Sequence, residues 1–104
     1  MGSVDFVYTI KYHPAVKRED IPKLSQEIRS RIKKAIETKL AYEPEKYGIP
    51  LRGTLKKYWK LKVGDYRIVF KVKVKDKEVI ILGIRHRKDI YKYVNRRTSL
   101  SFSK

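Results

Sequence analysis

The feature that most constrains the fold of this chain is a pair of alternating stretches joined by a short turn. Apolar Trp59 and Leu61 alternate with polar or amphipathic neighbours, which is the period of a half-buried β-strand. Gly64-Asp65 then breaks the alternation with turn-forming residues, and a second alternating stretch follows over residues 66–74. The sequence therefore predicts two strands, joined by a tight turn, with one face directed toward a core.

The same pleat gathers positive charge on the opposite face of the predicted sheet. Because side chains alternate between the two faces of a strand, apolar positions on the core side leave a set of cations on the other side. These cations are Lys60, Lys62, Arg67 and Lys71. Such a face suits a phosphodiester backbone, and solvated cations on an open sheet face are the alternative interpretation.

A later stretch, residues 78–87, is almost continuously apolar at its centre and is predicted to form a central strand. If Leu82 and Ile84 face the core, the intervening positions join the basic face. Those positions are Gly83, Arg85 and Arg87. Gly83 would also leave room for a ligand to approach the sheet.

The remaining chain is expected to supply a first strand and the helices that cover the sheet. We expect a strand at residues 4–12 and helical segments at 15–24 and 25–42, with a break near Pro22. A loop is expected at 43–50. A short helix should begin at about Asp89, with a frayed tail after it. The predicted order is β-α-α-β-β-β-short α. Residues 1–104 should form one α+β domain with its helices on one sheet face.

The charge of the chain limits its partners. Lys and Arg number 27 against 11 Asp and Glu, so the formal net charge is +16. This excess indicates a polyanionic partner, with nucleic acid first, an acidic protein second and an anionic membrane third. A Lys-rich, heat-adapted surface is the alternative explanation. Hydrophobic residues make up 41% of the chain, which is enough to form a core.

Other kinds of catalytic site have little support. The chain has no cysteine, so disulfides, thiol nucleophiles and zinc–cysteine sites are excluded. His13 and His86 have no partner at metal-ligand spacing and no carboxylates cluster, so we expect neither a metal nor another cofactor. No apolar run approaches the length of about 20 residues needed to cross a bilayer, and residues 1–5 lack the features of a signal peptide. We expect a cytoplasmic protein without a membrane partner.

Clustered cations on a sheet could bind RNA or cleave it. A lysine crowded by other cations loses its proton more readily and can act as a base, and arginines stabilise negative charge on phosphate oxygens. Tyrosines beside the basic face could stack on unpaired bases. The expected catalytic residues are Lys60, Lys62, Arg67 and Arg87. The expected substrate-binding residues are Tyr58, Lys71, Arg85 and Tyr91.

Three strings of the sequence resemble the RelE toxins of bacterial and archaeal toxin–antitoxin pairs. They are Leu51-Arg52-Gly53, the stretch from Tyr58 to Phe70, and the stretch from Ile84 to Tyr91. The resemblance covers about 40 residues closely, and the helical hairpin before them agrees in order and length. It implies a small, mostly antiparallel sheet with helices on one face and a basic, concave face on the other.

The resemblance also implies an activity. RelE-like toxins are metal-independent endoribonucleases that cleave mRNA in the ribosomal A site by attack of a 2′-OH on the adjacent phosphate. By position, Lys60 and Lys62 match the lysines on the base side, and Arg67 matches the arginine that holds the phosphate. Arg87 matches a general acid or charge stabiliser, although Arg85 could exchange roles with it, and Tyr91 matches the tyrosine on which a base stacks.

The partners implied by the resemblance are the ribosome with its rRNA, mRNA, and a cognate RelB-type antitoxin. The antitoxin would neutralise the basic face, and operator DNA would be bound only through the toxin–antitoxin complex. The related ParE branch shares the fold and inhibits DNA gyrase, so gyrase inhibition is the main alternative function. RNA binding without catalysis is a third.

Overall fold

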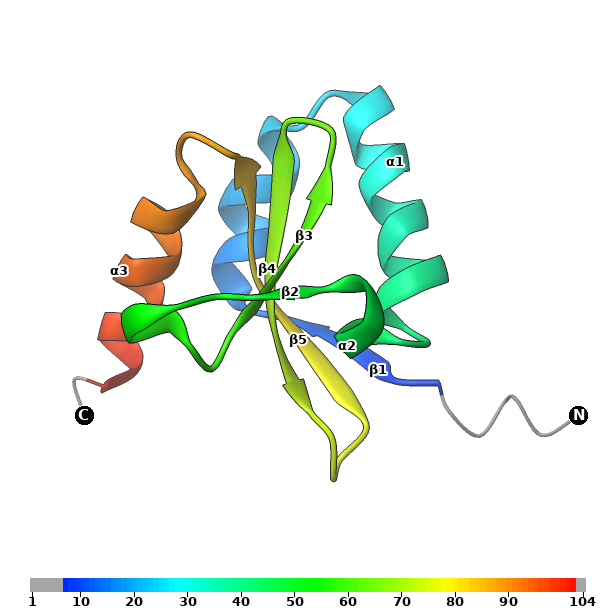
Figure 1. The fold of residues 1–104 in the computed structure, drawn as a ribbon. Coiled ribbons are helices and arrows are strands. Elements are labelled where there is room, and N and C mark those ends of the chain that lie inside the picture. Colours follow the sequence, from blue (N-terminus) through cyan, green and yellow to red (C-terminus); the bar gives the residue numbers. More distant parts are fainter. Residues whose placement is uncertain (1–6, 103–104) are drawn as a thin grey trace, which may run out of the picture.

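A computed structural model describes residues 7–102 of the protein as a five-stranded sheet with helices on both faces (Figure 1). The strand order is β1-β5-β4-β3-β2, and only β1 and β5 are parallel neighbours. The strands are β1 (Thr9–Tyr12), β2 (Ile49–Pro50), β3 (Trp59–Val63), β4 (Tyr66–Lys73) and β5 (Glu78–His86). The α+β class, the mostly antiparallel sheet and the hairpin around Gly64 are therefore confirmed.

The helical segments also follow the predicted order. They are η2 (Val16–Asp20), η3 (Ile21–Lys23), α1 (Gln26–Ala35), η4 (Ile36–Leu40), α2 (Pro44–Tyr47), η5 (Gly53–Leu55) and α3 (Ile90–Phe102). The break expected near Pro22 is present, because the winding changes from π to 3-10 at Ile21. Ser25 caps α1, since its hydroxyl oxygen accepts a hydrogen bond of 3.2 Å from the Ile28 N–H.

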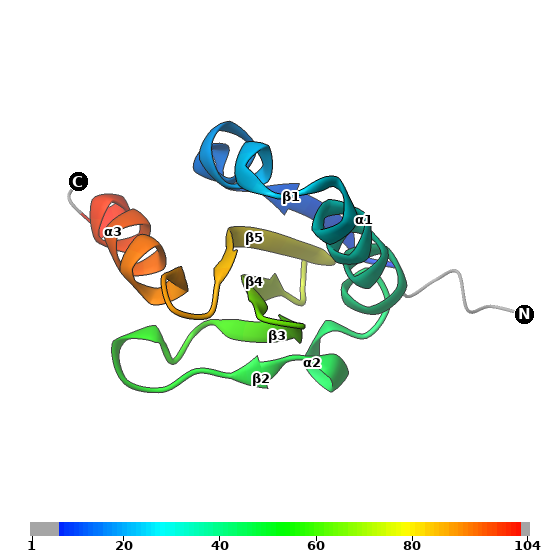
Figure 2. The ribbon, with the colours of Figure 1, turned by 90° about the horizontal axis from the view of Figure 1, so that it is seen from above.

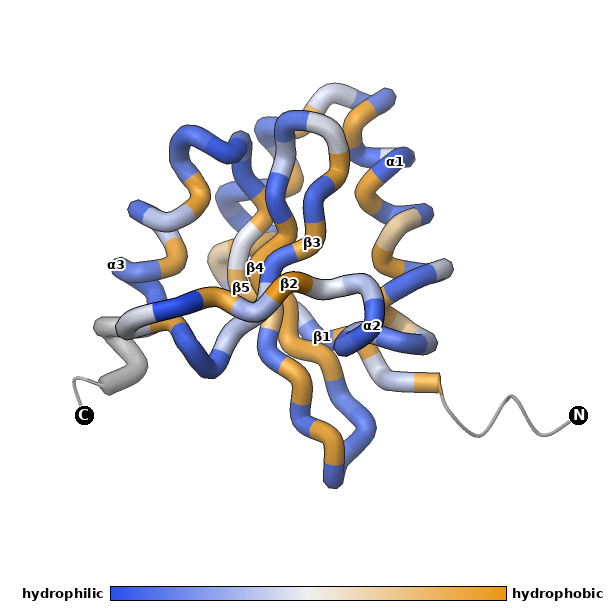
Figure 3. Tube along the Cα trace, in the orientation of Figure 1, coloured by the Kyte–Doolittle hydropathy of each residue, from blue (hydrophilic) through white to orange (hydrophobic). Residues whose placement is uncertain are grey.

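The main core lies between the helical hairpin and one sheet face. The apolar stripe of the hairpin supplies Ile32, Ile36 and Leu40, and the sheet supplies Leu61, Ile68, Phe70 and Ile81. Figure 3 shows hydrophobic positions alternating with hydrophilic ones along α1 and along the strands. Burial of this apolar surface is the principal force that holds the hairpin on the sheet.

The second sheet face is not open along its whole length, which corrects one prediction. Figure 2 shows α1 and α3 on opposite sides of the sheet. Ile90 and Val94 of α3 form a second core with Val69, so not all helices lie on one face. A Cβ atom on Gly83 would lie 3.0 Å from Ile90 Cδ1 and 3.2 Å from Val94 Cγ2. The glycine therefore admits this helix, and the expectation that it leaves room for a ligand was wrong.

The prediction that Leu82 and Ile84 both face the core by strict alternation was wrong, because β5 contains a β-bulge. Val69 pairs with Gly83 while the next residue, Phe70, pairs with Ile81, so Leu82 is the extra residue. The alternation of faces restarts at this bulge. Ile84 and Ile81 consequently share the main core, although strict alternation would place them on opposite faces.

Other differences concern the boundaries of elements. The predicted loop at 43–50 contains the helical turn α2, which begins at the buried Pro44, and the short strand β2. The helix α3 continues to Phe102 and is longer than the short helix predicted. The predicted first strand is present from Thr9, and its residues 4–6 lie outside the described part of the chain.

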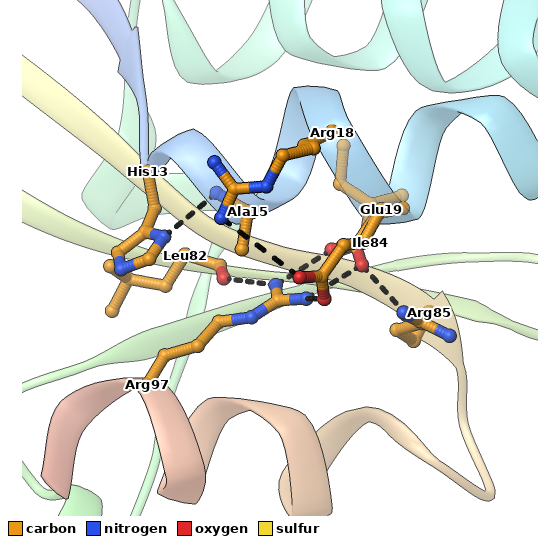
Figure 4. A network of polar contacts seen from close by, with 9 residues as sticks. His13, Ala15, Arg18, Glu19, Leu82, Ile84, Arg85 and Arg97 are labelled. Carbon is orange, nitrogen blue, oxygen red and sulfur yellow. Dashed lines mark hydrogen bonds and ion pairs between the residues drawn. The ribbon is translucent and has the colours of Figure 1, made fainter. Parts of the chain in front are cut away.

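A buried carboxylate, Asp20, joins three elements of the fold. It accepts hydrogen bonds from the Ile84 N–H at 2.9 Å, from Arg85 Nε at 2.7 Å, and from Arg97 Nη1 and Nη2, both at 2.8 Å. Figure 4 shows Arg97 extending from α3 toward η2 and β5. Arg97 Nη1 also donates to the Leu82 carbonyl at 2.8 Å. Asp20 thus connects η2, β5 and α3.

We expect Asp20→Ala to destabilise the protein by about 3–5 kcal/mol, because it removes the buried carboxylate that accepts two hydrogen bonds from the Arg97 guanidinium. The side chain of Arg97 is only 5% exposed and that of Asp20 is not exposed at all. Urea unfolding followed by circular dichroism measures the change. In a double-mutant cycle, the variant with both Asp20→Ala and Arg97→Ala should lose much less unfolding free energy than the sum of the losses in the two single variants. An additive result would contradict the coupling.

Acid should remove the contribution of Asp20 to stability. Burial alone would raise its pKa, but hydrogen bonds from Arg97, the Ile84 N–H and Arg85 outweigh burial and lower the pKa below its ordinary value of 3.8. Because the folded-state pKa is the lower one, the stabilisation is complete above the unfolded pKa and is lost as the pH falls through the folded value. The difference in unfolding free energy between the parent and Asp20→Asn should therefore be constant above about pH 5 and shrink below it. Asp76→Asn, in the exposed turn between β4 and β5, is the control substitution.

Candidate functional site

Three cations form a row across the second face of the sheet. Lys62 on β3 lies directly opposite Arg67 on β4, and Arg67 lies directly opposite Arg85 on β5. Lys60 pairs with Val69, whose side chain belongs to the core beneath α3, so Lys60 shares this face. Like charges directly opposite one another repel, so the Lys62–Arg67 pair is a cost to the fold. Such a cost is expected where a sheet is adapted to an anionic ligand.

Lys60 and Tyr91 line one surface hollow, which we call the Lys60–Tyr91 hollow. Its volume is about 520 Å³, and its lining residues are Ile49, Pro50, Leu51, Arg52, Leu55, Lys60 and Tyr91. The segment after β2 and the start of α3 thus bring an aromatic ring and two cations together. No role was predicted for Arg52, which precedes η5 and lies far from Tyr91 in the sequence although both line this hollow.

Arg67 and Arg87 lie near the turn between β3 and β4. Arg67 Nη1 donates to the carbonyl oxygens of Gly64 and Tyr66, each at 2.9 Å. These bonds use one of the three guanidinium nitrogens, so Nε and Nη2 remain available to a ligand. Arg87 lies past the end of β5, with its Nε 3.8 Å from Asp65 Oδ1, and this pair is weak because both side chains are more than half exposed.

Comparison with known proteins identifies the family of the chain. Residues 10–91 match the sequence profile of the ParE toxins of type II toxin–antitoxin systems, parDE. The chain belongs to this toxin family. It is a RelE-type toxin of the RelE/ParE superfamily, as the proteins similar to it in sequence and structure indicate.

The proteins similar to this chain include a toxin and two toxin–antitoxin complexes. The chain is 31% identical to toxin RelG of Mycobacterium tuberculosis H37Rv over 85 residues, which cover 82% of this chain and 97% of RelG. The toxin–antitoxin complex RelBE2 of M. tuberculosis matches with a TM-score of 0.73 at 29% identity, over 80% of this chain and 94% of the matched one. An archaeal RelE–RelB complex from Pyrococcus horikoshii matches with a TM-score of 0.58 at 28% identity, over 78% and 96% of the two chains.

Arg85 is the expected site residue whose placement differs most from the prediction. Its side chain is only 12% exposed, its Nε donates to Asp20, and its guanidinium carbon lies 3.7 Å from the centre of the Tyr93 ring. Arg87, two positions later, is exposed instead. The sequence did not reveal this difference, because Asp20 is 65 positions from Arg85.

Two further predicted ligand residues of the toxin lie apart from the row of cations. Lys71 is opposite Ile80, four positions along β4 from Arg67 and beyond the bulge, which is about 13 Å away at the rise of a strand. Tyr58 packs against the core formed by Leu55 and its neighbours. The structure therefore brings together Lys60 with Tyr91, and Lys62 with Arg67, and leaves Lys71 separate.

The two histidines occupy structural positions in the toxin. His86 Nδ1 accepts from the Lys88 N–H at 3.2 Å, and its ring meets Tyr66 edge-on, with the ring centres 5.7 Å apart. His13 Nδ1 accepts a 3.1 Å bond from the Ala15 N–H at the start of the first helical segment. Burial lowers the pKa of His13, and the charges of Arg97 and Arg18 lower it further.

Between residues 7 and 102, no group of three acidic, His or Cys side chains could hold a metal. No helix in this part of the chain is long and apolar enough to cross a membrane.

Charge reversal at Lys62 should stabilise the toxin while harming its site. Lys62→Glu replaces a repulsive cross-strand pair with an attractive one opposite Arg67, and the expected gain is about 0.5 kcal/mol in unfolding free energy. Lys60→Glu is the matched control, because Lys60 faces the uncharged Val69 across the strands. Thermal unfolding at low ionic strength measures both. Equal shifts in the two variants would mean that net charge, not the row of cations, controls the effect.

Proposed function

We propose that this toxin is a ribosome-dependent endoribonuclease that cleaves mRNA in the ribosomal A site and thereby inhibits translation. The observation that carries the proposal is the placement of Lys60, Lys62 and Arg67 on one sheet face, with Tyr91 beside Lys60. Cations at these positions can contact successive phosphates, and the tyrosine offers a stacking surface for a base. The RelE-type toxins to which this chain is similar supply the reaction class.

The proposed chemistry uses only groups of the protein and the RNA. Lys60, assisted by Lys62, removes the proton from a ribose 2′-OH, whose oxygen attacks the adjacent phosphorus. Arg67 directs Nε and Nη2 toward the phosphate oxygens and stabilises their growing charge. The bond from phosphorus to the 5′-oxygen breaks, and Arg87 stabilises that leaving oxygen or assists its protonation. The products are a 2′,3′-cyclic phosphate and a free 5′-hydroxyl.

Arg85 has no direct role in this proposal. Its guanidinium is committed to Asp20 and Tyr93, so it acts as a positioning residue for the end of β5. The exposed Arg87 is then the arginine of this pair that can reach RNA. The sequence alone left these two roles interchangeable.

A RelB-type antitoxin is the proposed protein partner in the cytoplasm. Two similar structures are complexes of a toxin with its antitoxin, RelBE2 and the archaeal RelE–RelB. A chain with a net charge of +16 offers an acidic partner a broad complementary surface. Antitoxin carboxylates that pair with the exposed Lys62 and Arg87 would block the binding of RNA. Operator DNA would then be bound through the toxin–antitoxin complex.

Gyrase inhibition is the second candidate, because the matching family profile is named for the ParE toxins. A gyrase inhibitor would tolerate the loss of Lys60 and Lys62, which the proposed nuclease does not. A DNA supercoiling assay with purified gyrase separates the two functions. Inhibition of supercoiling by the parent and by Lys60→Ala alike would favour the ParE mode.

The decisive experiment maps new 5′ ends on a defined mRNA, with and without programmed ribosomes. The parent should cut within A-site codons only when ribosomes are present. Lys60→Ala and Arg87→Ala should each reduce the single-turnover rate about 100- to 1,000-fold, as expected for a lost general base or charge stabiliser. Lys75→Ala, in the exposed turn between β4 and β5, is the matched control and should cleave like the parent. Intact mRNA under both conditions would refute the proposal.

A further inference from the structure

A second basic surface lies between α1 and the β3–β4 turn, and we call it the α1 groove. Its volume is about 340 Å³, and it is lined by Arg31, Lys34, Ala35, Thr38, Lys39, Lys62, Val63 and Gly64. Figure 1 shows α1 running beside β3 at this position. Lys62 of this groove and Lys60 of the Lys60–Tyr91 hollow are two positions apart on the same side of β3.

The short β2 strand explains why this groove is open. It pairs only with Trp59 and Lys60, so the outer edge of β3 is uncovered by β2 at Lys62 and Val63. Lys62 and Val63, at this uncovered part of β3, line one side of the groove. Lys62 therefore belongs both to the row of cations on the sheet and to the lining of the α1 groove.

The opposite wall comes from one face of the helix. Arg31, Lys34 and Thr38 follow one another at spacings of three and four, so their side chains project together. The Thr38 hydroxyl donates to the Lys34 carbonyl at 2.7 Å. Gly64, at a φ of +59°, leaves space for the Arg31 guanidinium, which lies 3.3 Å from where a Cβ atom would be. The turn glycine thus allows an arginine to close over the end of the groove.

The charge of the groove is not neutralised by the protein itself. Within residues 7–102, no carboxylate lies within 4.0 Å of the charged nitrogens of Arg31, Lys34, Lys39 or Lys62. The neighbouring aromatic contact, Lys39 Nζ at 5.6 Å from the centre of the Tyr47 ring, adds no negative charge. The four cations that line the groove therefore repel one another, and an anion bound between them would relieve this repulsion.

The lining favours a phosphate backbone over a peptide. Ala35 and Val63 are the only apolar lining residues, and both are small, so the groove lacks the anchor pockets that an amphipathic helix requires. The hollow on the other side of α1 is different, because isoleucines and a leucine dominate its lining. Phosphate oxygens need only cations and donors such as these, without an apolar floor.

We propose that the α1 groove binds the phosphodiester backbone of RNA and extends the RNA-binding surface from the Lys60–Tyr91 hollow around the edge of β3. The identity of the polyanion as RNA rests on the proposed nuclease function. Lys62 joins the two parts, so a single RNA segment can contact both. The backbone belongs either to the single-stranded message beside the cleaved codon or to folded ribosomal RNA, and both present the same phosphates.

The test compares two double variants that remove equal charge from the helical region. Lys34→Gln with Lys39→Gln changes the groove, while Lys23→Gln with Lys33→Gln changes exposed lysines that do not line it. Fluorescence anisotropy measures binding to a labelled single-stranded RNA and to a labelled RNA hairpin at several salt concentrations. Loss of two phosphate contacts should reduce the slope of log K against log salt by about 1.4 for the single strand or about 1.8 for the duplex.

A reduced slope in the groove variant alone supports the proposal, and the RNA that shows it identifies the source of the backbone. Equal losses in both variants would overturn it, since they would indicate diffuse attraction by net charge. Unchanged RNA binding with weakened binding to a polyglutamate peptide would also overturn it and assign the groove to an acidic protein.

A cleavage measurement keeps the two proposals separate. On programmed ribosomes, the groove variant should raise the toxin concentration needed for half-maximal cleavage and keep the maximal rate. Lys60→Ala should lower the maximal cleavage rate. The groove's contribution to the slope of log K against log salt should be unchanged in this variant. If the parent does not cleave at all, the anisotropy comparison still decides whether the groove binds RNA.

Discussion

The buried carboxylate of Asp20 is the interaction on which the arrangement of this toxin most depends. A carboxylate out of contact with water is costly unless its oxygens are fully hydrogen-bonded and its charge is paired. Asp20 meets both conditions with partners from β5 and α3. The result is that α3 is fixed over one part of the second sheet face, and Tyr91 at its start is held beside Lys60.

The basic surface, in contrast, is assembled at a cost to the fold. Side chains alternate between the two faces along β3 and β4, and the register of these strands places Lys62 directly opposite Arg67, where their charges repel. The main core on the opposite face holds the strands in this register, because a slip by one residue would expose Leu61 and Ile68. Apolar burial on one face thus maintains a repulsive arrangement on the other, and a polyanion would relieve that repulsion.

The period-two pattern of the sequence was sufficient to predict the hairpin and the shared face of Lys60, Lys62 and Arg67, because alternation is a local property. The bulge at Leu82 was not predictable in this way. One extra residue moves every later side chain of the strand to the other sheet face, and no distinctive residue type marks the position. The role of Asp20 also depended on distant partners. A charged residue in a helical segment is normally assumed to be exposed, and only the fold places Asp20 next to Arg97.

The separation of Arg85 from Arg87 follows from the same network. Both arginines have the same parity on β5 and its extension, so alternation treats them as equivalent. Asp20 removes this equivalence, because Arg85 would have to give up its 2.7 Å hydrogen bond to this buried carboxylate before it could bind phosphate. Arg87, with only the weak Asp65 pair to break, can bind a ligand at little cost. Under the proposed function, a partner that neutralises the toxin would have to occupy Arg87 and the lysines of β3, while Arg85 stays bound to Asp20.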